Sequence, residues 1–282
     1  MAPTPASLVL GAEKLSSVPL VYARLNTAIS SGKASATFLG TIIGQDTALT
    51  ARLLKLVNSP FYGFPGKIDT IPRAVMVVGT QQLRDLAIAT TVMDSFKGIS
   101  SRHISIEEFW KHSVACGITA RIIAGFGRQS NVEKFFVAGL LHDVGRLVMF
   151  QKIPELCNGI LEKAAGTGAL MLEVEQEVLG FDHATVGGAL IRSWRLPANI
   201  ETAVAWHHAP GDAVNYTYEA SVVHIADVIV HAMEIGSTGE HQVPECDDDA
   251  WDVLGLPSDG LARIFDQVDR QFNDVFLSLT SQ

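Results

Sequence analysis

The side chains of this sequence that could carry out chemistry together are histidines and carboxylates that recur through the middle of the chain. Glu108 and His112 are four residues apart, so both lie on one face if that segment is helical. His142 and Asp143 are adjacent inside the apolar run of residues 136–150. The remaining members come from separate downstream segments and are His183, the pair His207-His208, and Asp227.

An ionised side chain inside an apolar segment is costly unless it is paired or bound to a metal. Imidazole and carboxylate groups together suit first-row divalent metals. Eight such groups are enough for two or three octahedral ions that keep water in open positions, and a multinuclear site of this kind can generate a hydroxide and clamp a phosphate. The predicted metal ligands are Glu108, His112, His142, Asp143, His183, His207, His208 and Asp227.

Other interpretations of single residues stay open on the sequence alone. His142 and Asp143 could form a satisfied buried pair without any metal. Glu108 could complete a helix-capping box with a serine three residues before it. The pair His207-His208 could be a surface helix end, where the helix dipole favours histidine.

The other histidines and one cysteine have weaker claims to the site. His224 is expected in the core or beside a ligand rather than as a ligand itself. Cys116 follows His112 by four residues, so a Cys/His nucleophile is one interpretation. A small buried core cysteine is the favoured interpretation. The histidines expected on the surface are His103, His231 and His241.

The spacing of apolar residues predicts an all-helical fold. Residues 136–150 carry apolar side chains at intervals of three and four, which predicts a buried helix within residues 131–151. Asp46 and Thr70 are expected helix N-caps, and no segment gives a strong strand pattern. Further helices are predicted at residues 18–29, 46–57, 70–79, 80–96, 105–125, 154–165, 170–180, 183–194, 197–208, 216–234 and 258–279, and an acidic loop at residues 247–249.

The composition is that of a globular protein. Hydrophobic residues make up 48% of the 282 positions and charged residues 18%, which excludes a disordered chain. No apolar stretch approaches the ~18 residues of a membrane span, and no basic segment precedes the short apolar run near the N-terminus, so no signal peptide is expected. Three widely spaced cysteines form no disulfide framework or CxxC pair, which favours a cytoplasmic location.

Charge is unevenly distributed along the chain. Residues 1–100 hold 9 Lys and Arg against 5 Asp and Glu, whereas residues 101–282 hold 12 against 25. We therefore predict an N-terminal helical subdomain (1–100) and a second helical subdomain (101–282), within one continuous unit of residues 17–280. The acidic second half argues against a nucleic-acid-binding face, and no membrane contact is expected.

Ten short motifs along the chain have recognisable spacing: Val18-Pro-Leu20, Asp46-Thr-Ala-Leu-Thr-Ala-Arg-Leu-Leu54, Asn58-Ser-Pro-Phe-Tyr-Gly63, Ile71-Pro-Arg-Ala-Val75, Phe109-Trp-Lys-His-Ser113, Ala138-Gly-Leu-Leu-His-Asp-Val-Gly-Arg146, Asp182-His183, Leu196-Pro197, His207-His208 and His224-Ile-Ala-Asp227. Together they resemble the HDOD family of bacterial signalling proteins, which belongs to the HD superfamily of metal-dependent phosphohydrolases. The resemblance implies an all-α protein in which an N-terminal helical bundle packs on an HD-domain-like helical core.

The eight predicted ligands also resemble the metal ligands of HD-GYP cyclic-di-GMP phosphodiesterases, which bind two or three ions. Three positions differ from that enzyme family. Ala209 replaces a glutamate after the His pair, the segment Pro210-Gly-Asp-Ala-Val214 replaces the Gly-Tyr-Pro loop, and Arg146 replaces the usual lysine. These differences argue against cyclic dinucleotide hydrolysis and leave metal binding intact, and Arg146 can still hold a phosphate bidentately.

The resemblance implies an HDOD-type signal-transduction protein with a retained HD metal-binding site and a protein signalling partner, which the N-terminal subdomain would contact. The alternative is a metal-dependent phosphohydrolase that acts on a nucleotide or small phosphoester ligand. In that alternative His142 and Asp143 help to hold the metals, a bridging water attacks phosphorus, and Arg146 or Lys111 neutralises the phosphate. Both hypotheses imply two or three divalent ions, with Fe, Mn or Ni favoured over Mg. A third hypothesis is a structural His–Asp core that holds no metal.

Overall fold

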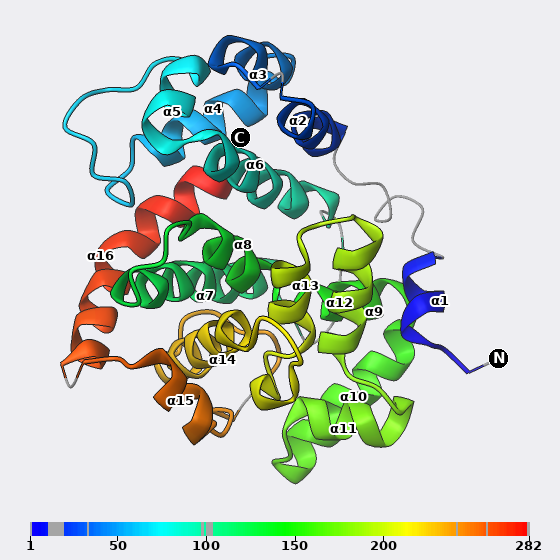
Figure 1. The fold of residues 1–282 in the computed structure, drawn as a ribbon. Helices are drawn as coiled ribbons and strands as arrows, with labels where there is room; N and C mark the ends of the chain where they lie inside the picture. The colour runs from blue at the N-terminus through cyan, green and yellow to red at the C-terminus, as the bar shows by residue number, and fades with distance from the viewer. Residues whose placement is uncertain are drawn as a thin grey trace.

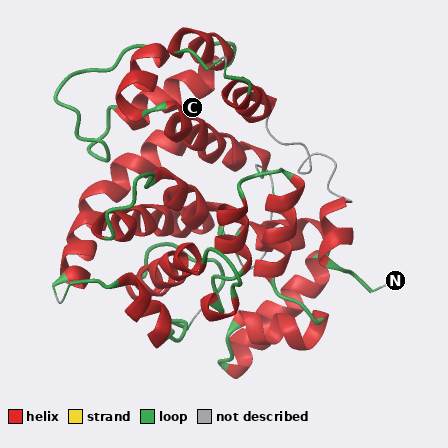
Figure 2. Ribbon diagram, viewed as in Figure 1, coloured by secondary structure: helices red, strands yellow, loops and turns green. Residues whose placement is uncertain are grey.

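The computed structural model consists of helices joined by loops (Figure 1; Figure 2). It describes residues 2–10, 20–32, 34–96, 99, 104–240, 242–257 and 259–280. Within these residues no β-strand occurs, which confirms the predicted all-α fold class. None of the helices in this described part of the chain is long and apolar enough to cross a membrane.

Helices α2 to α6 form an N-terminal bundle, at the top of Figure 1. Two predicted N-caps are confirmed, because Asp46 Oδ1 accepts a hydrogen bond from the Leu49 amide at 2.9 Å and Thr70 Oγ1 accepts one from the Arg73 amide at 3.4 Å. The predicted start of the first helix, Val18, lies outside the described residues. The helices of the bundle are α2 (Leu20–Ser30), α3 (Ala36–Ile43), α4 (Thr47–Val57), α5 (Ile71–Val78) and α6 (Thr80–Ser95).

The second half of the chain folds into helices that surround the predicted ligands. They are α7 (Ile106–Phe126), α8 (Glu133–Leu141), α9 (Val144–Lys152), α10 (Pro154–Thr167), α11 (Met171–Leu179), α12 (His183–Ser193), α13 (Ala198–Ala205), the 3₁₀ helix η1 (Pro210–Asp212), α14 (Thr217–Ala232), α15 (Asp248–Leu254) and α16 (Gly260–Thr280). The sequence predicted neither α3 nor the short helix α1 (Pro5–Leu10). Helix α1 packs against α12 and α9 with Leu8 and Val9 buried.

Residues 131–151 form two helices rather than the single helix that the periodicity predicts. The first ends at Leu141 and the second begins at Val144, so His142 and Asp143 form the junction. In an unbroken helix the Gly139 carbonyl would accept the amide of Asp143, whereas here it accepts the Nδ1–H of His142 at 2.7 Å. The junction places both polar side chains at a helix end, where side chains from other helices can meet them.

The acidic segment at residues 247–249 is not the predicted loop but the start of helix α15. Asp247 Oδ1 accepts a hydrogen bond from the Ala250 amide at 2.9 Å and so caps the helix. Asp248 and Asp249 follow in the first turn, where the helix dipole favours carboxylates. Ser258, the predicted cap of the last helix, lies outside the described residues.

Two glycines allow the ligand-bearing helices to approach one another closely. A Cβ atom at Gly139 on α8 would lie 2.7 Å from the carbonyl oxygen of Cys116 on α7. A Cβ atom at Gly145 on α9 would overlap the carbonyl oxygen of His183 at the start of α12. Since any larger side chain would push these helices apart, the two glycines keep α8 close to α7 and α9 close to α12.

One hydrophobic core extends through both halves of the chain. Leu53 and Phe96 from the N-terminal half belong to the same buried cluster as Phe136, Val204 and Ile264 from the second half. Helix α16 packs on both α7 and α4 and so connects the two halves. The boundary near residue 100 separates regions of different charge, and its standing as a domain boundary stays a prediction.

Candidate metal centre

Side chains from α7, the α8–α9 junction and α14 form a first ligand group, which consists of His112, Cys116, His142 and Asp227. His112 Nε2 lies 3.0 Å from Asp227 Oδ1, and His142 Nε2 lies 3.4 Å from the same oxygen. One donor atom from each of the four residues lies within 4.8 Å of all the others, and all four residues are buried. This spacing allows the four side chains to share one ion.

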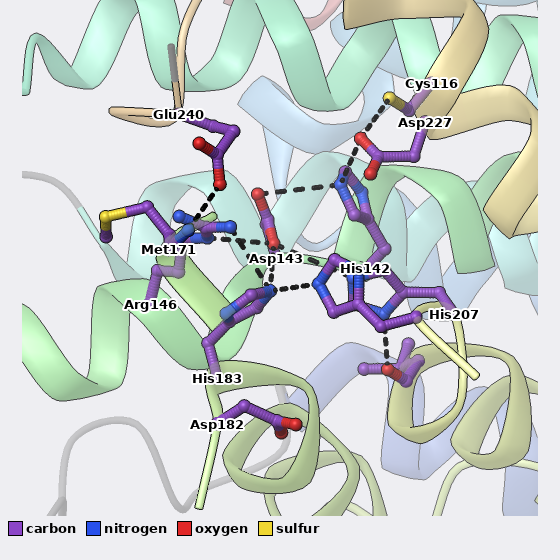
Figure 3. Close-up of polar contacts among 12 residues, drawn as sticks. Cys116, His142, Asp143, Arg146, Met171, Asp182, His183, His207, Asp227 and Glu240 are labelled. Atoms are coloured by element: carbon purple, nitrogen blue, oxygen red, sulfur yellow. Dashed lines mark hydrogen bonds and ion pairs between the residues drawn. The ribbon is translucent and has the colours of Figure 1, made fainter. Parts of the chain in front are cut away.

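A second ligand group consists of His183, at the start of α12, and the pair His207-His208, which follows α13. His183 Nε2 lies 2.9 Å from His208 Nε2. Asp143 lies between the two groups, with Oδ1 at 2.9 Å from His183 Nε2 and Oδ2 at 3.6 Å from His142 Nε2 (Figure 3). A carboxylate in this position can bridge an ion in one group to an ion in the other.

The rings of two histidines are oriented by backbone carbonyls behind them. His142 Nδ1 donates to the Gly139 carbonyl at 2.7 Å, and His207 Nδ1 donates to the Val204 carbonyl at 2.8 Å. Metal-binding histidines are held in this way in proteins, because a hydrogen bond at one ring nitrogen fixes the tautomer and leaves the other nitrogen as the ligand. The two Nε2 atoms are therefore the atoms that face the centre and are available to bind a metal ion.

His183 is oriented by a carboxylate that we did not predict from the sequence. Glu175 Oε2 accepts a hydrogen bond from the backbone amide of His183 at 2.8 Å and another from its Nδ1 at 2.6 Å. Glu175 is 1% exposed. Burial and the nearby Arg146 oppose protonation of His183, but the carboxylates of Glu175 and Asp143 raise its pKa to about 10. Any metal bound at Nε2 must displace this proton.

Two of the nitrogens that face the centre lack a hydrogen-bond partner. Within the described part of the chain, His142 Nε2 and His207 Nε2 are both buried and neither makes a hydrogen bond. Leaving a buried polar atom unpaired costs about 1–3 kcal/mol. A metal ion between the two groups would satisfy both atoms, so the donor set fits a metal centre better than it fits a self-contained His–Asp pair.

Two of the histidines are held neutral and ready to bind a cation. Burial lowers the pKa of His112 to about 4, although Asp227 acts in the opposite direction. Burial also lowers the pKa of His207 to about 3, and the rings of His142 and His183 add to this effect. Because only a deprotonated imidazole can bind a metal, these residues are in the required state at neutral pH.

The two buried carboxylates of the centre are ionised. Burial opposes ionisation of Asp143, but the guanidinium of Arg146 and the neighbouring histidines hold its pKa well below the usual range. Burial opposes ionisation of Asp227 as well, but His231 and His112 hold the pKa of that carboxyl well below the usual range. Both carboxylates are therefore in the deprotonated state that metal binding requires.

Arg146 lies inside the centre and contacts its bridging carboxylate. The residue is 3% exposed, its Nε donates to Asp143 Oδ1 at 3.1 Å, and its Nη2 lies 3.4 Å from His183 Nε2. From the sequence we expected Arg146 to hold a bound phosphate. In the structure the guanidinium neutralises Asp143, which is the role that a metal ion would share.

Two predicted site residues, Glu108 and Lys111, lie outside both ligand groups. Glu108 is partly exposed in the first turn of α7, where its Oε1 accepts a hydrogen bond from Lys111 Nζ at 2.7 Å. Lys111 also pairs with Glu107 at 3.1 Å. Ser105 Oγ accepts a hydrogen bond from the Glu108 amide at 3.4 Å, which is the N-cap half of the predicted capping box. The structure thus pairs these charged groups with one another at the start of α7.

Two further residues of the site carry signals in the sequence from which they could have been found. His231, which we expected on the surface, lies with Nδ1 at 3.0 Å from Asp227 Oδ1. It follows Asp227 by four residues on α14, so both share one helix face. Glu175 has the i, i+3, i+4 spacing of a buried helix stripe with Met171 and Val174, which marks it as a carboxylate on an apolar face.

His224 is a core residue, as the sequence predicted. Its Nδ1 donates to the His207 carbonyl at 2.7 Å, and its Nε2 accepts the Asp247 amide at 2.9 Å. Because both ring nitrogens are used in this way, His224 supports the ligand pair from behind. His103 and His241 lie outside the described residues.

A cavity of about 730 Å³ opens beside the second ligand group. It is lined by Thr185 and Arg192 of α12, by Trp206 and His208 after α13, and by Thr4 before α1. His208 belongs to both the ligand group and the cavity wall. A small molecule in this cavity would therefore reach the centre at His208.

The protein-family model described as the HDOD domain matches residues 15–210 of this chain. A protein of Treponema pallidum (strain Nichols), described only as uncharacterized, is 26% identical over 238 residues, which cover 83% of this chain and 46% of that protein. The chain therefore spans about half the length of the curated relative that it matches.

Solved structures with the same arrangement of helices come from several bacteria. An HDOD domain protein of unknown function from Geobacter sulfurreducens has a TM-score of 0.75 at 24% identity, with 94% of this chain and 92% of that chain covered. A candidate phosphohydrolase from Shewanella amazonensis SB2B has a TM-score of 0.75 at 23% identity, with 97% and 98% covered. At these identities the likeness shows the fold.

Proposed function

Because the chain belongs to the HDOD family, we propose that it is a signal-transduction protein of that family whose HD-like centre holds divalent transition-metal ions. The observation that carries this proposal is the pair of buried Nε2 atoms of His142 and His207, which have no hydrogen-bond partner within the described residues and lie near the ionised Asp143. These side chains converge, and His207 and Asp143 are already deprotonated, as a metal site requires. Burial opposes protonation of His142, but Asp143 and Asp227 raise its pKa, so an ion at His142 Nε2 would displace a proton.

The proposed centre holds one ion in each ligand group, with Asp143 between them. His112, His142 and Asp227 would hold the first ion. His183, His207 and His208 would hold the second. The bound ions would supply Lewis acidity and a bound water of lowered pKa. A set rich in imidazole suits Fe, Mn, Ni or Zn better than Mg.

We favour a signalling role because most of the centre is enclosed. His112, His142, His183 and His207 are each 1% exposed or less, and the guanidinium of Arg146 contacts Asp143. In this proposal the ions hold the helices of the second half in one arrangement, and a protein partner in the cytoplasm reads that arrangement. The N-terminal bundle, with its excess of basic residues, is the proposed contact face for an acidic partner.

The alternative function is a metal-dependent phosphohydrolase for a nucleotide or another small phosphoester. The cavity beside His208 favours this alternative, since it gives a small molecule a route to the second ligand group. A metal bound at Asp143 would weaken the ion pair between Asp143 and Arg146. Arg146 would then be able to bind a phosphate that reaches the centre.

Elemental analysis of protein purified without chelator tests metal binding. We expect more than one transition-metal ion per chain in the wild type and a loss of metal in the His142→Ala and Asp143→Ala variants. Asp266→Ala is the matched control, because Asp266 is exposed and pairs with Arg270 in a surface salt bridge. A wild type that contains no metal, with unchanged stability on chelation, would contradict the proposal and leave the structural His–Asp core as the explanation.

Hydrolysis assays on a panel of phosphoesters separate the two functions. No turnover by fully loaded protein supports the signalling role. Turnover that disappears in His142→Ala and Asp143→Ala, and persists in Asp266→Ala, supports the phosphohydrolase instead. Turnover that survives in both site variants excludes this centre as the source of the activity.

A further inference from the structure

The first ligand group contains a sulfur atom that the two proposed functions leave unexplained. Cys116 follows His112 by one turn of α7, and its Sγ lies 3.3 Å from His112 Nε2 and 3.9 Å from Asp227 Oδ1. The side chain is fully buried. Figure 3 shows the sulfur next to the carboxylate of Asp227. The thiol is therefore about as close to these donors as they are to one another.

Three separations within this group are close to those around a tetrahedral ion. Metal–nitrogen and metal–oxygen bonds of about 2.0–2.1 Å and a metal–sulfur bond of about 2.3 Å place N and O about 3.3 Å apart and N and S about 3.6 Å apart. The observed values are 3.0 Å from His112 Nε2 to Asp227 Oδ1, 3.4 Å from His142 Nε2 to the same oxygen, and 3.3 Å from His112 Nε2 to Cys116 Sγ. Each lies within about 0.4 Å of the tetrahedral value.

A second observation indicates an ion at this point rather than a simple contact between Cys116 and His112. His142 Nε2, from a different helix end, is aimed into the same group, is fully buried, and makes no hydrogen bond within the described residues. An S–H···N hydrogen bond between Cys116 and His112 would leave this nitrogen unsatisfied. An ion shared by all four side chains would satisfy it.

The surroundings of the thiol are otherwise apolar. Cys116 packs with the buried Ala115 and Val230 and with the partly buried Ile235 and Phe272. These neighbours account for a small residue at the position but not for the direction of the sulfur. The packing therefore leaves the contacts with His112 and Asp227 as the feature to be explained.

We propose that Cys116 is a metal ligand, which binds as a thiolate to an ion also held by His112, His142 and Asp227. This inference rests on the proposed metal centre and deepens it. On binding, the thiol releases its proton to solvent and one metal–sulfur bond forms, with no change of oxidation state. Because a soft thiolate selects Zn²⁺ or Fe²⁺ over Mn²⁺ or Mg²⁺, the first ligand group is a zinc or iron site with two nitrogens, one sulfur and one oxygen.

The test uses a variant of the full chain in which Cys116 is the single remaining cysteine. The double variant Cys157→Ala/Cys246→Ser retains Cys116 alone. We expect its Co²⁺-loaded form to show a thiolate-to-cobalt charge-transfer band in the near ultraviolet, and its Zn²⁺-loaded form to show an X-ray absorption sulfur shell at about 2.3 Å. Cys116→Ala should lose both signals and bind Zn²⁺ at least about 100-fold more weakly, since even changes outside the ligand sphere cost about 10–100-fold.

The possible outcomes distinguish failure of this inference from failure of the proposed metal centre on which it rests. A sulfur signal in the double variant that is absent from Cys116→Ala supports the inference. More than one bound ion per chain without any sulfur signal overturns it and leaves the metal centre standing. No bound metal overturns both. If Cys116→Ala fails to fold, the double variant decides alone, because a sulfur signal there can come only from Cys116 or from a methionine, and a thioether gives no thiolate charge-transfer band.

Discussion

Glu175 offers the sharpest test of how the centre is positioned. Its Oε2 accepts two hydrogen bonds from His183, one from the backbone amide at 2.8 Å and one from Nδ1 at 2.6 Å. The substitution Glu175→Gln keeps the size of the side chain and removes its charge. Losing a carboxylate behind a metal-bound histidine typically costs about 10–100-fold in metal affinity, or about 1.4–2.7 kcal/mol. Because Glu175 makes both contacts, we expect the upper end of that range.

The loss of affinity should also depend on pH in a defined direction. In the wild type the ring of His183 has a pKa of about 10, so a proton competes with the metal at neutral pH. Glu175→Gln removes one cause of that raised pKa and therefore weakens the competition. The variant's defect should be smallest near pH 6.5, the ordinary pKa of histidine, and should grow as the pH rises toward about 10.

Chelator competition, with metal content measured at each free-metal concentration, gives the affinities of the two ligand groups. Glu175→Gln should lose the ion of the second group first and retain that of the first group. The matched control is Glu177→Gln on the same helix, since Glu177 is exposed and pairs with Lys163 at the surface, where an ion pair contributes little. If Glu175→Gln and Glu177→Gln bind both ions equally tightly at every pH, then Glu175 does not position a metal ligand.

Three further predictions concern stability. Chelation should lower the melting temperature, because an ion at 100 times its dissociation constant stabilises the folded state by about 2.7 kcal/mol; calorimetry of loaded and stripped protein measures this, and equal melting temperatures would count against the centre. Gly145→Ala should force α9 away from the carbonyl of His183 and reduce both stability and metal content. Gly159→Ala is the control, because a Cβ atom there meets no neighbouring atom within 4 Å, and it should stabilise the protein by about 0.5–1 kcal/mol. Denaturant unfolding and elemental analysis of the two variants measure these effects. In metal-free protein the raised pKa of His183 contributes stability that is complete below pH 6.5 and is lost as pH rises through about 10, because protonation then favours the folded state; denaturant unfolding should show this decline, and His183→Gln should flatten it.

The sequence predicted the helices best where local chemistry marks their ends. The side chains of Asp46 and Thr70 cap the helices that follow them, as the residue types indicated. The junction at His142-Asp143 was missed because the spacing of apolar residues predicts only which face of a helix is buried. It does not predict that a side chain will hydrogen-bond to a backbone carbonyl and end the helix. The hydrogen bond from His142 Nδ1 to the Gly139 carbonyl is such a case.

The sequence identified most of the residues of the site, but it did not predict how their side chains contact one another. Spacing and residue type nominated His112, His142 and Asp227, and the structure brings them together. The spacing of Glu175 with Met171 and Val174 marks it as a carboxylate on a buried helix face. Its contact with His183 depends on how α11 packs against α12, and the local spacing does not determine that packing. The phosphate-binding role of Arg146 stays a prediction, and the sequence did not reveal that its guanidinium contacts Asp143.

The proposed function requires that imidazoles and carboxylates from separate helices share metal ions deep in the second half of the chain. A crystal structure of protein purified without chelator, with anomalous scattering recorded at the absorption edges of Fe, Zn, Mn and Ni, measures this directly. We predict one anomalous peak among His112, His142 and Asp227 and another among His183, His207 and His208, with Asp143 between them. Well-ordered side chains at these positions with no anomalous peak, in protein soaked with metal, would contradict the claim.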